Sequence, residues 1–420
     1  MLNQSLNFIK KIKNSFFPFY RNKELKFVFD TLQKGFPKET VVARFVGGCV
    51  RKFLKYEKID DIDIATILNS NEIKNKFNNT KFKLIDTGIK HGTVTLISDQ
   101  LKLELTTLRK DVETDGRHAE VEYINDWQLD SERRDFTINA IYMDINGKIF
   151  DPQSGIFDLK NNNVKFIGDP NLRIQEDYLR IIRLLRFAIQ YDSSNDKTTI
   201  DALKLNLSGI KKISKERILN ELLKILNLKN FDNILKHENK KKIFSLVFPE
   251  FKYLGRLEKL YKVKEFININ QYFLLVILLI DQNNNHEYFA YKYNVSNKIK
   301  KELELFNQLF LQSLKNKNFF EKDIEKNIYL YGKKQLIYLN TLIFTENINF
   351  KIADFLRLNK AILEAKTHKF TIDGEYLVSK GVKEGPLVGK VLKEIESQWI
   401  ENGFEISKDS IKKIIKFNLD

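Results

Sequence analysis

Cysteine, proline and glycine are scarce in this chain of 420 residues. The single cysteine, Cys49, excludes an internal disulfide framework and fits a reducing compartment. The 17 glycines and 6 prolines exclude a collagen-like or low-complexity protein and disfavour a loop-rich all-β protein. Because hydrophobic residues make up 43% of the chain, we expect a folded and mostly helical protein.

Long hydrophobic runs are also missing. The longest apolar run, YFLLVILLI at residues 272–280, is far shorter than the roughly 20 residues of a membrane-spanning helix, and it predicts a buried helix instead. The first 20 residues are basic and aromatic in patches, without the apolar region and small-residue cleavage site of a signal peptide. We therefore expect a cytoplasmic protein without a membrane segment.

Acidic residues are outnumbered. The chain has 71 Lys and Arg against 55 Asp and Glu, a net charge of +16 that suits a polyanionic partner such as nucleic acid. A coding bias towards Lys, Asn, Ile and Phe would also produce part of this excess. Residues 1–180 hold 29 basic and 26 acidic side chains, whereas residues 181–420 hold 42 and 29. The basic surface is therefore expected mainly in the C-terminal part.

Hydrophobic periodicity changes along the chain. Between residues 41 and 166, short runs such as VVARFV, DIDIAT, GTVTLIS and LKLELTTL predict strands with some helix between them. After residue 176, stretches such as SKERILNELLKIL repeat apolar residues at helical spacing. Gly168, Asp169 and Pro170 mark the change. The sequence thus predicts an α+β fold class, an α/β head of strands and helices followed by an all-helical remainder.

Two glycines and two aspartates form the first motif. Gly47 and Gly48 lie between a predicted strand and a predicted helix, where backbone amides could approach a triphosphate and Arg51 could add charge. Asp61 and Asp63 project from one side of a strand, and their mutual repulsion is explained by a bound divalent cation. Taken singly, each feature is also compatible with a plain turn or a solvated strand edge. The strand at residues 101–108 offers Glu104 as a third carboxylate or as an exposed side chain.

Arginines paired with carboxylates form the next motifs. Arg133, Arg134 and Asp135 suit a triphosphate and ribose site, although such a cluster also starts ordinary helices. EDYLRIIRLLRFA predicts one helix that presents a polar face opposite an apolar stripe, with a solvated basic face as the alternative interpretation. The polar face consists of Asp177, Arg180, Arg183 and Arg186.

A carboxylate and a guanidinium one helical turn apart can distinguish bases. Cytosine and adenine both present an exocyclic amine beside a ring-nitrogen acceptor, so Asp177 would accept from the amine and Arg180 would donate to the ring nitrogen. Uracil and guanine reverse this polarity and would leave buried groups unpaired, at a cost of about 1–3 kcal/mol each. The pair would therefore select CTP and ATP.

In combination these motifs resemble a known family. FVGGCVR, DIDIAT, RRDFTINA, EDYLRIIRLLRFA and ERILNELLKIL lie between about residues 40 and 230, in the order found in bacterial class II CCA-adding tRNA nucleotidyltransferases and their poly(A) polymerase relatives. The resemblance implies a polymerase-β-like nucleotidyltransferase head at residues 1–170 and a helical neck with the nucleotide-reading helix at 171–235. A helical body and tail that bind tRNA would follow at 236–420, and no obligate protein partner is implied.

The resemblance also implies an activity. The family adds CCA to the 3′ acceptor end of tRNA from CTP and ATP without a template, by magnesium-assisted attack of the 3′-hydroxyl on the α-phosphate. Carried over by position, Asp61 and Asp63 would be catalytic and bind Mg²⁺, and Asp135 would lie near the ribose. Gly48 and Arg51 would bind the triphosphate, and Arg134 would bind the nucleotide. Asp177 and Arg180 would read the base, and Arg183 and Arg186 would support the nucleotide-binding site.

One residue departs from the family pattern, and two further segments resemble the family. The family usually has Asp where Lys52 stands, so we expect the loss of a local salt bridge or cap rather than of catalysis. Residues 106–127, with Gly116, resemble a flexible loop that helps the switch from CTP to ATP. In the tail, Gly385 and Pro386 open a predicted helix, which either meets a tRNA phosphate or is a simple helix start.

Other activities remain open at this point. A poly(A) polymerase, or an enzyme that adds only CC or only A, would share the same motifs. The chain ends soon after IKKIIKFNLD, without the extra basic tail frequent in poly(A) polymerases, which favours CCA addition. A non-catalytic RNA-binding protein is a more distant alternative, because an idle site has no need for two repelling aspartates.

Overall fold

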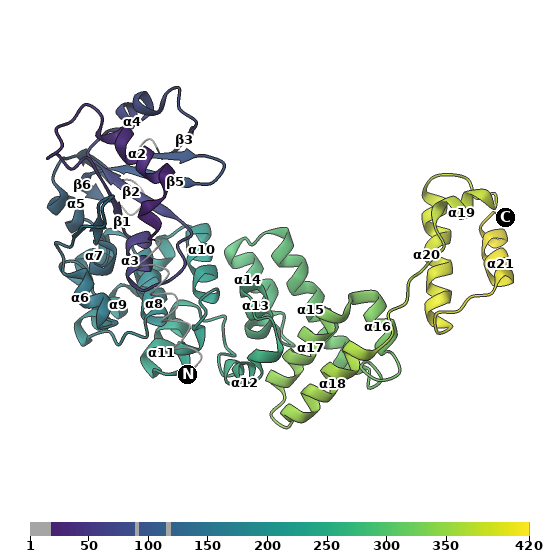
Figure 1. Ribbon diagram of the computed structural model, residues 1–420. Coiled ribbons are helices and arrows are strands. Elements are labelled where there is room, and N and C mark those ends of the chain that lie inside the picture. Colours follow the sequence, from purple (N-terminus) through teal and green to yellow (C-terminus); the bar gives the residue numbers. More distant parts are fainter. Residues whose placement is uncertain (1–17, 89–91, 115–118, 420) are drawn as a thin grey trace. The chain divides into compact units, whose positions relative to one another are not determined.

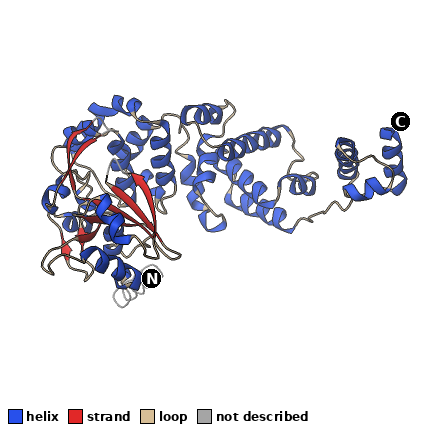
Figure 2. Cartoon of the chain, turned by 90° about the horizontal axis from the view of Figure 1, so that it is seen from above, coloured by secondary structure: helices blue, strands red, loops and turns tan. Residues whose placement is uncertain are grey.

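The computed structural model describes residues 18–88, 92–114 and 119–419 (Figure 1). The chain forms two compact units, Met1–Pro249 and Glu250–Asp420. The predicted neck–body boundary at residues 235 and 236 lies within the first unit. Strands are drawn only in the first unit, and in the described chain none follows Phe150 (Figure 2). The expected α+β head and helical remainder are therefore confirmed.

The first unit contains a seven-stranded sheet in the order β3-β4-β5-β2-β1-β8-β9 and a two-stranded sheet of β6 and β7. The strands are β1 (Ala43–Val46), β2 (Ile62–Thr66), β3 (Lys83–Gly88), β4 (Thr93–Ile97), β5 (Lys102–Thr107), β6 (Arg109–Thr114), β7 (Ala119–Tyr123), β8 (Tyr142–Met143) and β9 (Ile149–Phe150). β2 runs antiparallel to β1 and parallel to β5. The hairpin of β6 and β7 occupies much of the segment predicted as a flexible loop, and Gly116 lies outside the described residues.

The two faces of the seven-stranded sheet differ. Phe45 on β1 lies opposite Ile64 on β2, and both are fully buried on the face covered by α2 (Lys23–Gln33) and α3 (Gly48–Leu54). Side chains alternate along a strand, so Asp63 and Ala65 point to the opposite face. That opposite face carries a hydrophobic cluster of its own, which includes Ala65.

Helices follow the sheet in the first unit and make up the second. In the first unit they are α4 (Ser70–Phe77), α5 (Trp127–Glu132), α6 (Gly155–Lys160), α7 (Pro170–Glu176), α8 (Leu179–Gln190), α9 (Lys197–Asn206), α10 (Lys215–Leu226) and α11 (Glu238–Val247), with the short 3-10 helices η1 (Phe19–Arg21), η3 (Thr137–Asn139), η4 (Leu207–Lys212) and η5 (Phe231–Leu235). In the second they are α12 (Arg256–Lys262), α13 (Gln271–Leu279), α14 (Asn285–Tyr293), α15 (Asn297–Lys315), α16 (Ile324–Tyr331), α17 (Lys333–Glu346), α18 (Ile352–Glu364), α19 (Gly374–Ser379), α20 (Pro386–Glu401) and α21 (Lys408–Leu419), with the short 3-10 helix η6 (Lys264–Phe266). The apolar run at residues 272–280 is a buried helix, as predicted. Within the described ranges, no helix is both long and apolar enough to cross a membrane.

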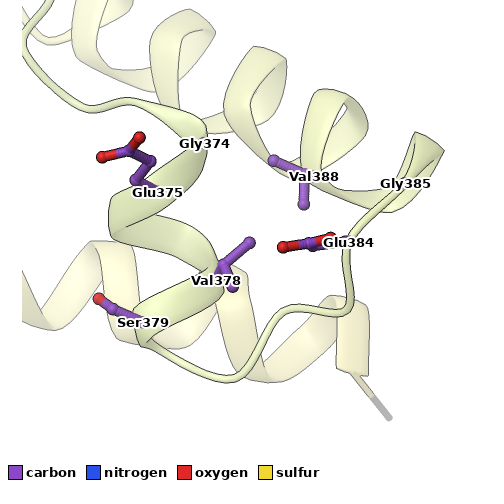
Figure 3. Close-up of a pocket in the computed structure, with 7 residues that line it drawn as sticks. All are labelled: Gly374, Glu375, Val378, Ser379, Glu384, Gly385 and Val388. Carbon is purple, nitrogen blue, oxygen red and sulfur yellow. The ribbon is translucent and has the colours of Figure 1, made fainter.

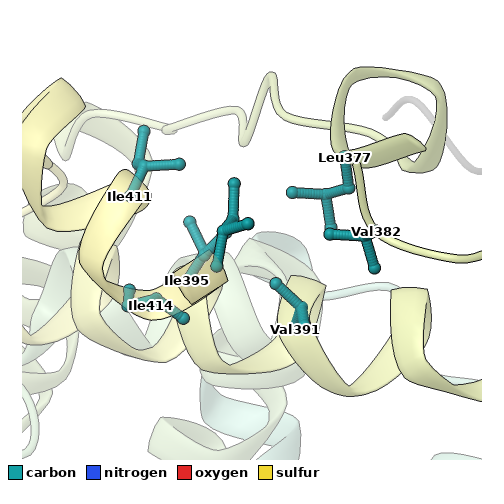
Figure 4. Close-up of a cluster of buried hydrophobic side chains, with 7 residues drawn as sticks. Leu377, Val382, Val391, Ile395, Ile411 and Ile414 are labelled. Atoms are coloured by element: carbon teal, nitrogen blue, oxygen red, sulfur yellow. The ribbon is translucent and has the colours of Figure 1, made fainter. Parts of the chain in front are cut away.

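The last three helices have a hydrophobic cluster of their own. Figure 4 shows side chains of α19, α20 and α21 converging between the helices. The buried members are Leu377, Val382, Val391, Ile395, Ile411, Ile414 and Ile415. α20 begins at Pro386 after Gly385, whose φ of +125° favours glycine, so the predicted turn and helix start are confirmed.

Candidate active site

Two carboxylates stand at the start of the central strand β2. Asp61 precedes the strand and is exposed, whereas Asp63 lies within it and is half-buried. Asp63 and completely buried Ile64 point to opposite faces. The pairing of β2 with β5 places Glu104 beside Asp63. Glu104, whose position the sequence left open, therefore lies in the same acidic group.

The surroundings of Asp63 disfavour its negative charge. Burial is the largest cause that raises the pKa of Asp63 to about 6, and the negative charge of Glu104 adds to it. Asp61 raises this pKa further, whereas Arg134 and Arg51 lower it. A divalent cation would relieve the repulsion between the carboxylates.

The donor set fits a cation that completes its shell with other ligands. Among the residues that the structure describes, no group of three or more His, Cys, Asp or Glu could hold a metal ion. Asp61 and Asp63 nevertheless supply hard carboxylate oxygens at the start of β2, where Asp61 is exposed and Asp63 is half-buried. A small divalent cation commonly takes one or two carboxylates and completes its shell with water and phosphate oxygens.

The glycine turn brings the backbone next to this acidic group. Gly47 has a φ of +67°, a conformation that favours glycine, and precedes α3. A Cβ atom on Gly48 would lie 4.0 Å from Oδ2 of Asp63, and one on Gly47 would lie 3.9 Å from Nη1 of Arg134. The structure thus brings the glycine pair, Asp63 and Arg134 together.

Arg51 joins α3 to α8. The residue is only 6% exposed, and its guanidinium donates from Nε to Oη of Tyr191 at 2.8 Å and from Nη1 to Oδ1 of Asn139. It also lies over the ring of Phe187, 4.7 Å from the centroid. Arg51 therefore has partners within the protein, and its contact with a triphosphate stays a prediction.

Lys52 does not leave a gap where the family has aspartate. Its Nζ forms an ion pair with Oδ2 of Asp60 at 3.1 Å, and Asp60 immediately precedes Asp61. The hydrogen bond and charge of Lys52 lower the pKa of Asp60. Lys52 thus makes an ion pair of its own, and the loss of the salt bridge or cap that aspartate makes in the family stays a prediction.

Asp135 is a buried junction between the head and α8. It accepts hydrogen bonds from the backbone N of Phe136 at 2.9 Å, Nδ2 of Asn139 at 2.8 Å and Nε of Arg183 at 2.7 Å. Burial alone would raise the pKa of Asp135, but the charge of Arg183 and the hydrogen bonds lower it to about 2. Asp135 is therefore ionised and well satisfied, and its contact with ribose stays a prediction.

The predicted single helix from residue 176 is wrong. α7 ends at Glu176, Asp177 is extended with φ −153° and ψ 105°, and α8 begins at Leu179. Oδ1 of Asp177 accepts a hydrogen bond from the backbone N of Leu179 at 3.1 Å, while Oδ2 pairs with Arg217 at 2.6 Å. An Asp side chain that bonds a nearby amide competes with helix continuation. Asp177 therefore does not lie on the helical face of Arg180, Arg183 and Arg186 that the sequence predicted.

The arginines of α8 each have an acidic partner. Nη1 of Arg180 pairs with Glu176 and donates to the carbonyl of Arg173 at 2.7 Å. Arg183 bonds Asp135, and Nε of Arg186 donates to Oε2 of Glu221 on α10 at 2.7 Å. Arg186 also lies 4.1 Å above the ring of Phe187. The polar face of α8 is thus a set of ion pairs rather than a solvated basic face.

Sequence reasoning missed several partners of the predicted residues. Glu176 could have been found, because it is four residues before Arg180 and such pairs meet on helices. Arg217 and Glu221 lie in ERILNELLKIL, which was interpreted only as an apolar helix. Asp130 stands three residues before Arg133 and four before Arg134, and this helical spacing could have predicted both ion pairs.

A further cavity lies among the last helices. Its volume is about 600 Å³, and Figure 3 shows Val378, Glu384 and Val388 pointing toward one another within it. Gly385, at the start of α20, and Glu375 also line it. The carboxylate of Glu384 lies next to this helix start, and the contact of the start with a tRNA phosphate stays a prediction.

Known protein families match successive parts of the chain. The Poly A polymerase head domain matches residues 43–165, and the family described as "Probable RNA and SrmB- binding site of polymerase A" matches residues 196–254. A tRNA nucleotidyltransferase domain 2 family matches residues 265–415. The matched families follow the order of head and helical remainder.

Solved structures share the fold. The Bacillus stearothermophilus CCA-adding enzyme in complex with CTP has a TM-score of 0.66 at 21% identity, covering 95% of this chain and 98% of that one. The Thermotoga maritima CCA-adding enzyme complexed with tRNA has a TM-score of 0.61 at 21% identity, covering 95% of this chain and 96% of that one. The polymerase-type head followed by helices is thus the fold of this chain.

Sequence relatives cover nearly the whole chain. The human protein "CCA tRNA nucleotidyltransferase 1, mitochondrial" is 33% identical over 402 residues, which is 92% of this chain and 89% of that protein. The "CCA-adding enzyme" of Lactobacillus helveticus is 30% identical over 392 residues, which is 89% of this chain and 92% of that protein. The chain therefore belongs to the family of CCA-adding tRNA nucleotidyltransferases.

Proposed function

We propose that this protein adds CCA to the 3′ end of tRNA from CTP and ATP, without a nucleic-acid template. One observation carries the proposal: Asp63, the glycine turn and Arg134 lie close together near the start of β2. They do so in a chain 33% identical to a human CCA tRNA nucleotidyltransferase over 92% of its length. Carboxylates beside a glycine turn and a guanidinium suit transfer of a nucleotidyl group.

A divalent metal ion accompanies this chemistry in the family. We assign Mg²⁺ to Asp61 and Asp63, because oxygen ligands and nucleotide phosphates are its usual partners. When bound, Mg²⁺ neutralises charge on the reacting phosphates. Gly47 and Gly48 leave room for phosphate beside Asp63, and Arg134 adds positive charge there. The 3′-hydroxyl oxygen of tRNA bonds to the α-phosphorus, its proton is released to solvent, and the bond to pyrophosphate breaks.

Base selection is assigned to the break between α7 and α8. Asp177 would accept from the exocyclic amine of cytosine or adenine, and Arg180 would donate to the adjacent ring nitrogen. In the structure Asp177 is held by Arg217 and Arg180 by Glu176. These partners fix the two side chains in place, so that UTP and GTP meet mismatched donors and acceptors.

The basic C-terminal part is assigned to tRNA. Residues 181–420 carry 42 basic against 29 acidic side chains, which favours a polyanion. We place the enzyme in the cytoplasm, because the single cysteine, Cys49, is a buried free thiol that fits a reducing compartment. Fractionation of cells with an antibody to the protein tests this location.

The decisive experiment supplies purified protein with tRNA lacking its CCA end, Mg²⁺, and labelled CTP or ATP, singly and together. We expect two C residues and then one A, with ATP used only after CTP. A long A tract would identify a poly(A) polymerase, and a stop after CC or a need for prior CC would identify a partial enzyme. If no nucleotide is incorporated, the result would favour the alternative of a non-catalytic RNA-binding protein.

The ion pair of Lys52 and Asp60 gives a prediction about activity, because Asp60 immediately precedes Asp61. Lys52→Asp would set a carboxylate beside Asp60 and next to Asp61, and we expect incorporation to fall about fivefold, the effect of roughly 1 kcal/mol. The reversed pair, Lys52→Asp with Asp60→Lys, should recover activity to within about twofold. The measurement is kcat/KM for CTP with the same tRNA.

A matched pair elsewhere in the head is the control for this prediction. Lys74 on α4 and Asp86 on β3 form an ion pair of 2.9 Å, and the lysine side chain is 32% exposed against 23% for Lys52. The same single and double exchanges at this pair should leave kcat/KM unchanged. A reversed Lys52 and Asp60 pair no more active than Lys52→Asp alone would contradict a role for this ion pair.

A further inference from the structure

Asp130 is a completely buried carboxylate that the proposed chemistry does not use. It lies on α5, and its side chain is 0% exposed. Oδ1 accepts from Nε of Arg133 at 2.8 Å, and Oδ2 accepts from Nη2 of Arg134 at 3.0 Å and from Oη of Tyr142 at 2.7 Å. Because ionised carboxylates are costly to bury without partners, this arrangement makes Asp130 dependent on the two arginines.

The charge of Asp130 is secured by its neighbours. Burial alone would raise the pKa of Asp130, but the positive charges of Arg134 and Arg133 hold it well below its ordinary range. The hydroxyl of Tyr142 donates to Asp130 and accepts from Nε of Arg134 at 3.0 Å, so these side chains form a closed triangle. A carboxylate and a hydroxyl thus fix one edge of the Arg134 guanidinium.

The remaining nitrogen of Arg134 faces the candidate active site. With Nε and Nη2 bound by Asp130 and Tyr142, Nη1 lies where a Cβ on Gly47 would be 3.9 Å away. A Cβ on Gly48, the next residue, would lie 4.0 Å from Oδ2 of Asp63. The charge of Arg134 is felt there, because it lowers the pKa of Asp63.

We propose that Asp130, together with Tyr142, is a positioning residue that aims Nη1 of Arg134 at the phosphates of the incoming nucleotide. The identity of that nucleotide as CTP or ATP rests on the proposed function. A guanidinium held along one edge has little freedom to turn away, so its free edge is available at little entropic cost. Asp130 itself is too deeply buried to touch the substrate.

Nucleotide binding without turnover tests this proposal. The dissociation constants of CTP and ATP are measured at equilibrium with Mg²⁺ and without tRNA, so that the result does not depend on incorporation. Asp130→Asn removes the charge that holds Arg134 and should weaken binding of both nucleotides at least tenfold. Tyr142→Phe keeps the carboxylate, removes one hydrogen bond to Nε and should weaken binding about threefold, which serves if Asp130→Asn does not fold.

A double-mutant cycle separates positioning from general stability. If Asp130 acts through Arg134, Asp130→Asn should have no further effect on nucleotide binding when combined with Arg134→Ala. Equal losses with and without Arg134 would overturn the proposal, as would unchanged binding in both Asp130→Asn and Tyr142→Phe. A wild-type protein that binds CTP but incorporates nothing would refute the proposed function and leave this test intact.

Glu250 supplies the matched control. Its side chain is also 0% exposed, and it accepts from Oη of Tyr293 and from Nζ of Lys292 at 2.8 Å. Glu250 belongs to the second compact unit, whereas the proposed nucleotide-binding residues belong to the first. Glu250→Gln should lower the melting temperature as Asp130→Asn does, yet leave the dissociation constants of CTP and ATP unchanged. A comparable loss of nucleotide binding in Glu250→Gln would reduce the Asp130 effect to a consequence of instability.

Discussion

Asp63→Ala is expected to abolish nucleotide incorporation, with a loss on the order of 10³-fold or more in kcat, while the dissociation constant for tRNA stays within about twofold. The substitution removes a carboxylate that would hold the metal ion, which supplies several kcal/mol of charge stabilisation in the transition state. It leaves the basic surface of residues 181–420 unchanged. Single-turnover incorporation and filter binding of tRNA measure the two effects.

Unfolding is not expected to explain this loss. Burial raises the pKa of Asp63 to about 6, so the folded protein disfavours the charge that Asp63 carries at neutral pH. Removing that carboxylate should therefore keep the melting temperature at pH 7 or raise it. Asp86→Ala, on the edge strand β3, is the control that should retain full incorporation. Unchanged incorporation in Asp63→Ala would refute its metal-binding role.

Asp177→Ala is expected to relax nucleotide choice by about 10- to 100-fold. The carboxylate would accept from an exocyclic amine that only cytosine and adenine present in this arrangement, and one such buried hydrogen bond is worth about 1–3 kcal/mol of discrimination. Loss of this hydrogen bond should lower the ratio of kcat/KM for CTP to that for UTP, and likewise the ratio for ATP to that for GTP. Competition assays with all four nucleotides on truncated tRNA measure these ratios directly.

A capping aspartate on the same helix controls for local disruption. Asp169 accepts from the backbone N of Leu172 at 2.9 Å and caps the start of α7, whereas Asp177 lies at its end. Asp169→Ala should cost about 1 kcal/mol of stability without changing the nucleotide ratios. An Asp177→Ala enzyme that remains strict for C and A would contradict the assignment of base reading to this residue.

The strands and the acidic group were largely predictable, because period-two alternation is local. It identified the strand with Asp63 and placed that side chain opposite Ile64, whereas Asp61, expected on the same strand, lies just before it. The position of Glu104 was not predictable, since it depends on the parallel register of β5 with β2 rather than on either strand alone. The register between two strands forty residues apart cannot be predicted from the residue pattern of either strand.

The helix around Asp177 shows a different limit. Apolar spacing runs smoothly through EDYLRIIRLLRFA and predicts one helix, yet the chain breaks after Glu176. The break depends on a bond from the Asp177 side chain to a nearby amide and on the ion pair with Arg217, forty residues later. Periodicity reports which residues are apolar, but it does not report a side chain that replaces a helical hydrogen bond.

The ion pairs of α8 bear on how the enzyme could be re-engineered. Arg183 is matched to Asp135 in the head and Arg186 to Glu221 on α10, so the complements of this helix lie before and after it in the chain. If residues 176–190 were replaced by the same segment from a relative with another nucleotide preference, the new helix would therefore lack the acidic partners that it has in that relative. The base selection that we propose for this region would therefore be transferable only together with the acidic residues that pair with α8.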